Sequence, residues 1–222
     1  MNMKRTVMIL ILVLVLVFLA AKFAEEQRKK PGTVGELLAR AGNNATIGLV
    51  TSELDVDADD RLLSDTYQEK VERSVGLVEE VFLAEGGYLR VACVTGELIR
   101  YGNSTAESKR KNSKGPVSKE EFIGIVQRIL QFFEGGTEFT FDLQDGRAYS
   151  SFVSRKSEEY STPTEDDYWE INVPRVCCGY ECLSSVTIRV HMLSHRVAMV
   201  SNLPFVKPTE MVENISKKQT PE

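Results

Sequence analysis

Residues 88–101 read Tyr-Leu-Arg-Val-Ala-Cys-Val-Thr-Gly-Glu-Leu-Ile-Arg-Tyr, and this stretch decides the fold class. Residues 88–95 are rich in β-branched, aromatic and aliphatic side chains, which is typical of a strand. Gly96 supplies a tight turn, after which residues 98–101 predict a second strand. The stretch therefore predicts an antiparallel sheet at the centre of the domain.

Upstream of this hairpin, the pattern predicts helices around one strand. Thr33 and Glu36 form a capping box that opens a short helix closed by Gly42, and residues 47–52 predict a strand. A long helix is expected from the acidic run at residues 55–60 to about residue 84, where Glu85-Gly86-Gly87 ends it. Its apolar stripe, with steps of three and four residues, consists of Tyr67, Val71, Val75, Val78 and Phe82.

Downstream, a loop at residues 102–117 separates the hairpin from a second helix. Ser118 and Glu121 form the capping box of that helix, which runs to about residue 133. Strands at residues 138–143 and 148–153 flank an Asp145-Gly146 turn, which is a strong hairpin signal. Residues 169–173 predict a further strand, and residues 186–193 and 197–200 predict a last hairpin that turns at Ser194-His195.

The order of these elements predicts the fold class α+β. From residue 47 to residue 143 the order is strand, helix, strand, strand, helix, strand, which is the ferredoxin-like βαββαβ arrangement of an antiparallel sheet with two main helices. The last hairpin is a C-terminal extension of that sheet. We therefore expect a single α+β domain at residues 33–206, a charged tether at residues 25–32 and a flexible tail at residues 207–222.

The composition is that of an ordinary globular protein. The 222 residues include 27 Lys and Arg, 32 Asp and Glu, and 42% hydrophobic residues, with a formal net charge of −5. This balance excludes a disordered or collagen-like chain, and it gives no electrostatic reason to bind nucleic acid.

The amino terminus, residues 1–24, carries the strongest targeting signal. Residues 7–21 are uninterrupted apolar residues preceded by Lys4 and Arg5, which fits either a cleavable signal peptide or a signal anchor. Extended to residue 24, a helix of this segment would span about 27 Å, close to a hydrocarbon core of about 30 Å. Because the residues before the candidate cleavage points fit poorly, we favour an uncleaved, single-pass transmembrane anchor that makes the membrane its first partner.

Three acceptor sequons predict which side of the membrane the domain occupies. They begin at Asn44, Asn103 and Asn214, each near a turn or in the tail. Together with the cysteines they favour an extracytoplasmic or lumenal glycoprotein domain, and a secreted protein is the alternative if the amino-terminal segment is removed.

Four cysteines leave three interpretations open. In an oxidising compartment, Cys93 would form a disulfide with one of Cys177, Cys178 and Cys182, and a local bridge could join two of the cluster. In a reducing compartment, zinc could bind to Cys178, Cys182, His191 and His195, although the central gap between the pairs is short for a finger. The third interpretation is a reactive thiol paired with a histidine. Zinc is the only cofactor that the sequence suggests.

Lys109, Arg110, Lys111 and Lys114 form a basic run in the 102–117 loop. The run is either part of a solvated connector or a contact for anionic lipid or another polyanion. The sequence contains no phosphate loop, no GxSxG and no HExxH. We therefore expect a membrane-anchored, non-catalytic binding module that contacts a protein partner or an anionic surface. The alternative is a membrane-tethered enzyme or zinc-binding domain with its site between Cys177 and His195.

Overall fold

The computed structural model divides the chain into two compact units, Met1–Pro31 and Gly32–Glu222. The structure describes residues 12–13, 15–16, 30–63, 65–72, 76–84, 86–103, 115–134, 139–144, 146–155, 162–177 and 180–202. The predicted anchor at residues 1–24 therefore lies almost wholly outside the described residues. Within the described part of the chain, no helix has the length and apolarity needed to span a bilayer.

The second unit is an α+β domain with one large antiparallel sheet, as the sequence predicts. Its helices are α2 (Val34–Ala41), α3 (Asn44–Ser52), α4 (Lys119–Glu134) and α5 (Ser151–Arg155). Its strands are β1 (Gln68–Glu72), β2 (Gly76–Leu83), β3 (Gly87–Ala92), β4 (Leu98–Gly102), β5 (Phe139–Phe141), β6 (Arg147–Ser150), β7 (Tyr168–Cys177), β8 (Tyr180–His191) and β9 (Val197–Asn202).

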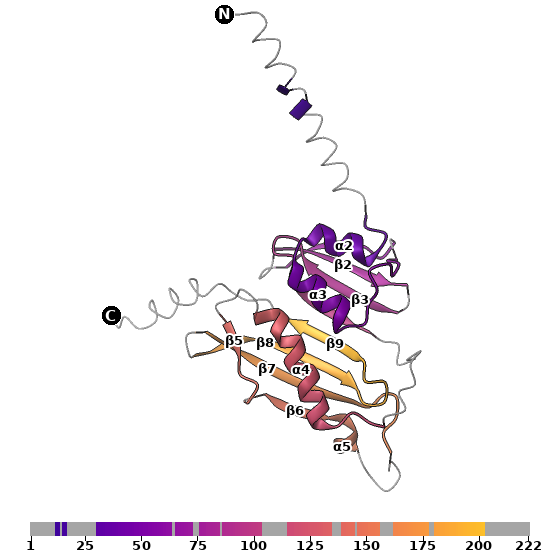
Figure 1. Cartoon of the computed structure of the whole chain (residues 1–222), viewed down its shortest axis with the longest axis vertical. Helices are drawn as coiled ribbons and strands as arrows, with labels where there is room; N and C mark the ends of the chain where they lie inside the picture. Colours follow the sequence, from indigo (N-terminus) through magenta and orange to yellow (C-terminus); the bar gives the residue numbers. More distant parts are fainter. Residues whose placement is uncertain are drawn as a thin grey trace, which may run out of the picture. The chain divides into compact units, whose positions relative to one another are not determined.

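The strands follow the order β1-β2-β3-β4-β9-β8-β7-β5, and β6 also pairs with β7. Figure 1 shows α3 and α4 on the same side of this sheet. Alternate strand residues such as Val81, Leu89 and Ile188 are buried with Leu49 of α3 and Phe122 of α4 in one apolar core. The core therefore lies between the helices and one face of the sheet.

Local capping signals position the helices where the sequence predicts them. At the start of α2, the backbone N–H of Glu36 donates to Thr33 Oγ1 (3.2 Å), and Gly42 closes the helix with a left-handed φ of 68°. At the start of α4, the Glu121 N–H donates to Ser118 Oγ and the Ser118 N–H donates to Glu121 Oε2, each at 3.1 Å. The capping box of α4 and the glycine C-cap of α2 are confirmed, and at α2 the Thr33 cap is present while Glu36 Oε2 accepts from the Gly32 N–H at 2.6 Å.

The ferredoxin-like order is wrong, because two upstream elements are exchanged. The predicted strand at residues 47–52 belongs to α3, which begins after Asn43, whose side chain accepts a hydrogen bond from the Thr46 N–H at 3.0 Å. The predicted helix at residues 55–84 is replaced by turns followed by β1 and β2. The residues of the predicted helical stripe divide between the two faces of the sheet, because Val71 pairs with Leu77, whereas Val78 and Phe82 occupy the alternating positions of β2.

The hairpin predicted at Asp145-Gly146 is also wrong. β5 pairs with residues 175–177 of β7 and β6 pairs with residues 169–172, so the two strands lie one after the other beside β7. The later hairpin is confirmed: β8 and β9 pair and turn at His195, whose φ is 58°.

The sheet contains an internal duplication that joins two halves. The N-terminal half comprises α3 and β1 to β4, and the C-terminal half comprises α4 and β6 to β9. Residue n of the β3–β4 hairpin corresponds to residue n + 99 of the β8–β9 hairpin. Both hairpins have a register shift, which follows Arg90 in the first and Arg189 in the second. Both also have a turn residue with a left-handed φ, Gly96 and His195.

The two halves meet at the pairing of β4 with β9. There, Tyr101 is the register partner of Val200, and these two residues correspond to each other under the duplication. The pairs on either side, Arg100 with Ser201 and Gly102 with Met199, exchange in the same way. A local two-fold axis therefore passes through the centre of the sheet, between β4 and β9.

Candidate functional site

The sheet face that points away from the helices, here called the open face, carries two continuous rows of side chains. The cross-strand register defines each row as a series of direct neighbours across seven or more strands. The polar row is Gln68, Glu80, Arg90, Arg100, Ser201, Thr187, Asn172 and Arg147. The aromatic row is Phe82, Tyr88, Gly102, Met199, Arg189, Glu170 and Tyr149. The internal duplication relates the two rows. It matches the polar row from Glu80 to Asn172 with the aromatic row taken in the opposite direction, from Glu170 to Phe82.

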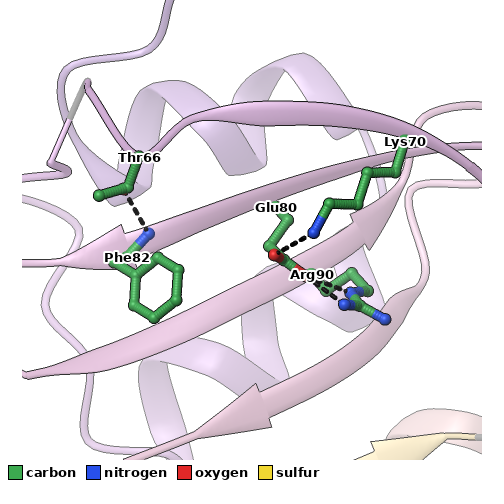
Figure 2. Close-up of polar contacts among 5 residues, drawn as sticks. All are labelled: Thr66, Lys70, Glu80, Phe82 and Arg90. Atoms are coloured by element: carbon green, nitrogen blue, oxygen red, sulfur yellow. Dashed lines mark hydrogen bonds and ion pairs between the residues drawn. The ribbon is translucent and has the colours of Figure 1, made fainter.

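Each half holds one arginine–glutamate pair at the same position of this face. In the N-terminal half, Arg90 Nε donates to Glu80 Oε2 at 2.7 Å, and Lys70 Nζ donates to Glu80 Oε1 at 2.7 Å (Figure 2). In the C-terminal half, Arg189 Nε donates to Glu170 Oε2 at 2.8 Å. The two pairs fix the guanidinium groups of Arg90 and Arg189 on the face.

The N-terminal pair is the more buried of the two, since the side chain of Glu80 is 10% exposed and that of Glu170 is 29% exposed. Burial alone would raise the pKa of Glu80. The hydrogen bonds from Lys70 and Arg90 outweigh that effect and hold the pKa of Glu80 below its usual value. Glu80 is therefore a carboxylate at neutral pH that stabilises the folded domain.

Aromatic rings cover both ends of the open face. In the N-terminal half, the rings of Phe82 and Tyr88 lie 5.9 Å apart, and the guanidinium of Arg100 lies 5.6 Å from the Tyr88 ring. A Cβ at Gly102 would lie 2.3 Å from the Tyr88 ring, so glycine allows this ring to lie directly over β4.

The C-terminal half has its own aromatic group. The guanidinium of Arg189 lies 4.1 Å from the centre of the Tyr168 ring, and the rings of Tyr149 and Tyr168 lie 6.4 Å apart. Tyr149 is 47% exposed and Phe82 is 42% exposed, so aromatic surface is accessible at both ends of the aromatic row.

The arginines of the two rows outnumber the carboxylates of the two rows. Arg90 and Arg100 are direct register partners, whereas the corresponding C-terminal pair is Arg189 with Met199. The two rows together contain four arginines and two glutamates, a balance of +2 on a chain whose net charge is −5. The open face can therefore attract an anionic group.

A second polar cluster lies on the helix-covered face of the N-terminal half. Glu79 is buried, accepts a hydrogen bond from the Tyr67 hydroxyl at 2.6 Å, and pairs with Arg40 of α2 at 3.2 Å. Burial, followed by the hydrogen bond and charge of Glu79, raises the pKa of Tyr67. The cluster holds a buried carboxylate against α2.

Cys93 lies beside that cluster as a half-buried free thiol. Burial and the carboxylates of Glu79 and Glu69 raise the pKa of Cys93 to about 11. The thiol is therefore protonated at neutral pH, which is the opposite of what a nucleophilic cysteine requires. The predicted reactive thiol has no support from Cys93.

The sheet order separates Cys93 from Cys177, one of its three predicted disulfide partners. β3, which leads into Cys93, lies four strand positions from β7, where Cys177 is, or about 19 Å at a spacing of about 4.8 Å. A disulfide needs Cα atoms about 6 Å apart. The side chains of Cys177 and Cys182 and the whole of Cys178 lie outside the described part of the structure, so a local bridge among these three stays a prediction.

Two of the four predicted zinc ligands lie far apart in this structure, whereas Cys178 lies outside the described residues, so the zinc site stays a prediction. Cys182 and His191 lie on one strand, β8, nine residues apart, which places their Cα atoms about 30 Å apart in extended backbone. His195 is engaged elsewhere, because its Nε2 lies 2.8 Å from the carbonyl oxygen of Gly115. Among the described residues, no cluster of three or more His, Cys, Asp and Glu side chains could hold a metal ion.

His191 lies on the open face beside Tyr168, its register partner. Both of its ring nitrogens are buried. Burial, and then the charge of Arg189, lowers the pKa of His191. His191 is therefore a neutral part of the C-terminal half at physiological pH.

The other predicted sites are only partly described. Asn44 is exposed at the start of α3, whereas the hydroxyl of Thr46, in the same sequon, accepts a hydrogen bond from the Leu98 N–H at 3.1 Å. Asn103 is half-buried at the end of β4. Asn214 and the basic run Lys109, Arg110, Lys111 and Lys114 lie outside the described residues. Glycosylation and the basic contact stay predictions.

Sequence reasoning missed the open face, although one signal of it was present. Leu89-Arg90-Val91 and Ile188-Arg189-Val190 repeat the same short pattern, and each lies on a strand that leads into a turn. Comparisons of the chain with protein-family models, curated proteins and solved structures found no match. The geometry of the open face is thus the basis for a functional proposal.

Proposed function

We propose that this chain is a membrane-anchored binding module, displayed outside the cytoplasm, whose open face contacts a protein partner. The observation that carries the proposal is the composition of the two rows: arginine, tyrosine, phenylalanine and methionine lie together on one face of the sheet. Arginine, aromatic residues and methionine are the types enriched at the centres of protein interfaces.

Two features of the face support binding rather than chemistry. Its carboxylates, Glu80 and Glu170, are engaged by arginines, so each is committed to positioning a guanidinium group. Its aromatic residues at both ends are exposed, which provides apolar contact area beside the charges. The amino-terminal anchor and the sequons support the proposed location, and carbonate extraction of membranes from cells that make the protein tests the anchor: the full-length chain should stay in the pellet.

Site-specific photocrosslinking of the full-length protein in those cells tests the open face. A benzophenone amino acid replaces Phe82 in one variant and Tyr149 in another, since these exposed rings lie at opposite ends of the aromatic row. Matched controls place the same group at Gln127 and Gln131, which are exposed on α4. We expect the Phe82 and Tyr149 variants to yield adducts with one and the same protein, identified by mass spectrometry. Equal adducts from all four positions would contradict the proposal.

A further inference from the structure

We infer that Arg90 and Arg100 form a carboxylate-binding pair at the centre of the open face, and that this pair recognises an acidic segment of the protein partner. The inference rests on the proposed function, because it names the chemistry of the partner that the open face would bind. It starts from the direct pairing of two arginines across neighbouring strands.

Like charges that face each other across a sheet are destabilising, so a retained pair of this kind needs a reason. Glu80 accepts hydrogen bonds from Arg90, but the strand register places Glu80 on the far side of Arg90 from Arg100. Among the described residues, Arg100 contacts the Tyr88 ring and the Met199 sulfur, 3.9 Å from its Nη2, and no carboxylate. A bound carboxylate between the two guanidinium groups would remove their repulsion.

The duplication supplies an internal control for this argument. Arg189, the counterpart of Arg90, has Met199 as its neighbour where Arg90 has Arg100. The C-terminal half therefore shows that the fold accepts an uncharged residue at the position of Arg100. The second arginine is a feature of one half only, and the common backbone does not require it.

The surroundings of the pair suit an extended acidic segment. Arg100 is exposed and lies next to the local two-fold axis, with the hydroxyls of Ser201 and Thr187 following it along the polar row. The Tyr88 ring lies beside it over Gly102 and offers apolar contact area. Guanidinium groups bind carboxylates in a planar, two-pronged geometry that lysine cannot reproduce.

Charge favours an acidic protein segment over two other possible occupants of the open face. A second copy of the chain docked through its own open face would oppose two surfaces that each carry a balance of +2. An anionic bilayer would meet Glu80 and Glu170 within the rows, and binding of such surfaces typically depends on clustered lysines and arginines without acidic neighbours. A protein segment can place its carboxylates at Arg90 and Arg100 and avoid both glutamates.

Binding of a defined acidic peptide to the full-length protein in detergent micelles tests the inference. The probe is a fluorescein-labelled decapeptide of alternating glutamate and phenylalanine, and its comparator has glutamine in place of glutamate. The key variant is Arg100→Met, which gives the N-terminal half the residue of the C-terminal half. Arg100→Lys retains the charge without the planar fork, and Arg128→Gln removes one exposed arginine charge from α4, outside the open face, as the matched control.

We expect wild type to bind the glutamate peptide at least about tenfold more tightly than the glutamine peptide. Arg100→Met should lose about tenfold in affinity, Arg100→Lys should lie between, and Arg128→Gln should change the affinity by less than about twofold. An Arg100→Met variant that keeps its thermal transition and binds the peptide like wild type would overturn the inference. So would binding to phosphatidylglycerol vesicles without binding to the peptide.

The photocrosslinking experiment separates failure of this inference from failure of the proposed function. If the adducts at Phe82 and Tyr149 persist in the Arg100→Met background, the open face binds a protein but not through the arginine pair. If no specific adduct forms in wild type, the proposed function itself fails. If Arg100→Met abolishes adducts and peptide binding alike, both proposals are supported.

Discussion

The two halves of the sheet share a backbone plan and differ in what they place at corresponding positions. Where the C-terminal half packs Trp169 against Phe122, with the rings 5.8 Å apart, the N-terminal half places Glu79 and pairs it with Arg40 and Tyr67. A carboxylate network therefore replaces an aromatic stack beneath the same strand position. The shared hairpins therefore set the backbone of each half, whereas the helix packed against each half sets which side chains can be buried there.

The turn residues show the same principle at the level of backbone conformation. Gly96 and His195 have similar left-handed φ values of 65° and 58°. At Gly96 a Cβ would lie 2.3 Å from the carbonyl oxygen of Ala41, whereas the His195 side chain has room and reaches Gly115. Glycine is required in one half by the neighbouring α2–α3 connection, and in the other half a side chain makes a contact of its own.

Substitution at the two turns should give the largest difference in stability between the two halves. Gly96→Ala should destabilise the domain by about 3–4 kcal/mol, because it combines left-handed strain with a clash against a backbone oxygen. His195→Ala should cost about 1 kcal/mol, from the lost hydrogen bond to Gly115. Urea unfolding of the full-length protein measures both. Similar losses for the two variants would mean that the turn conformation, and not its surroundings, sets the requirement.

The buried network of the N-terminal half is the next test. Arg40→Met should lower the free energy of unfolding by about 3 kcal/mol at pH 7. It removes the positively charged partner of the buried Glu79 carboxylate and leaves the hydrogen bond from the Tyr67 hydroxyl. Trp169→Phe is the matched change in the C-terminal half, and it should cost about 1 kcal/mol by removing the bond from the indole N–H to the Val117 carbonyl. A larger loss from Trp169→Phe would reverse our ranking of the two networks.

Sequence signals predicted those parts of this fold that depend on near neighbours in the chain. The helix caps at Thr33 and Ser118 and the turn at Gly96 are encoded within a few residues, and the structure has them. The segment at residues 76–83 was misassigned because it carries apolar residues on both faces, which removes the alternation expected of a strand. The open face depends on the register of Arg100 with Ser201, about 100 residues apart, which no local pattern specifies.

The corresponding ion pairs of the open face predict a smaller, pH-dependent difference. Glu80→Gln should cost about 1–2 kcal/mol at pH 7, whereas Glu170→Gln should cost less than about 1 kcal/mol because Glu170 is more exposed. Since the pKa of Glu80 is lowered in the folded state, its contribution is fully present above the ordinary value of 4.5 and is lost as the pH falls through the lowered value. The gap between wild type and Glu80→Gln should therefore close in acid. A gap that widens on acidification would show that the pKa is raised instead.

Cys93 gives the smallest expected effect, and its counterpart in the C-terminal half is Met192. Cys93→Met should change the free energy of unfolding by less than about 1.5 kcal/mol, because a methionine fills the corresponding site. In wild type, alkylation of Cys93 by iodoacetamide should be slow at pH 8 and accelerate as the pH approaches 11, since only the thiolate reacts and burial raises the pKa of this thiol. Non-reducing peptide mapping should recover the Cys93 peptide unlinked, in agreement with the four strand positions between β3 and β7. Recovery of that peptide joined to Cys177, Cys178 or Cys182 would require a different strand order, and with it a different relation between the two halves.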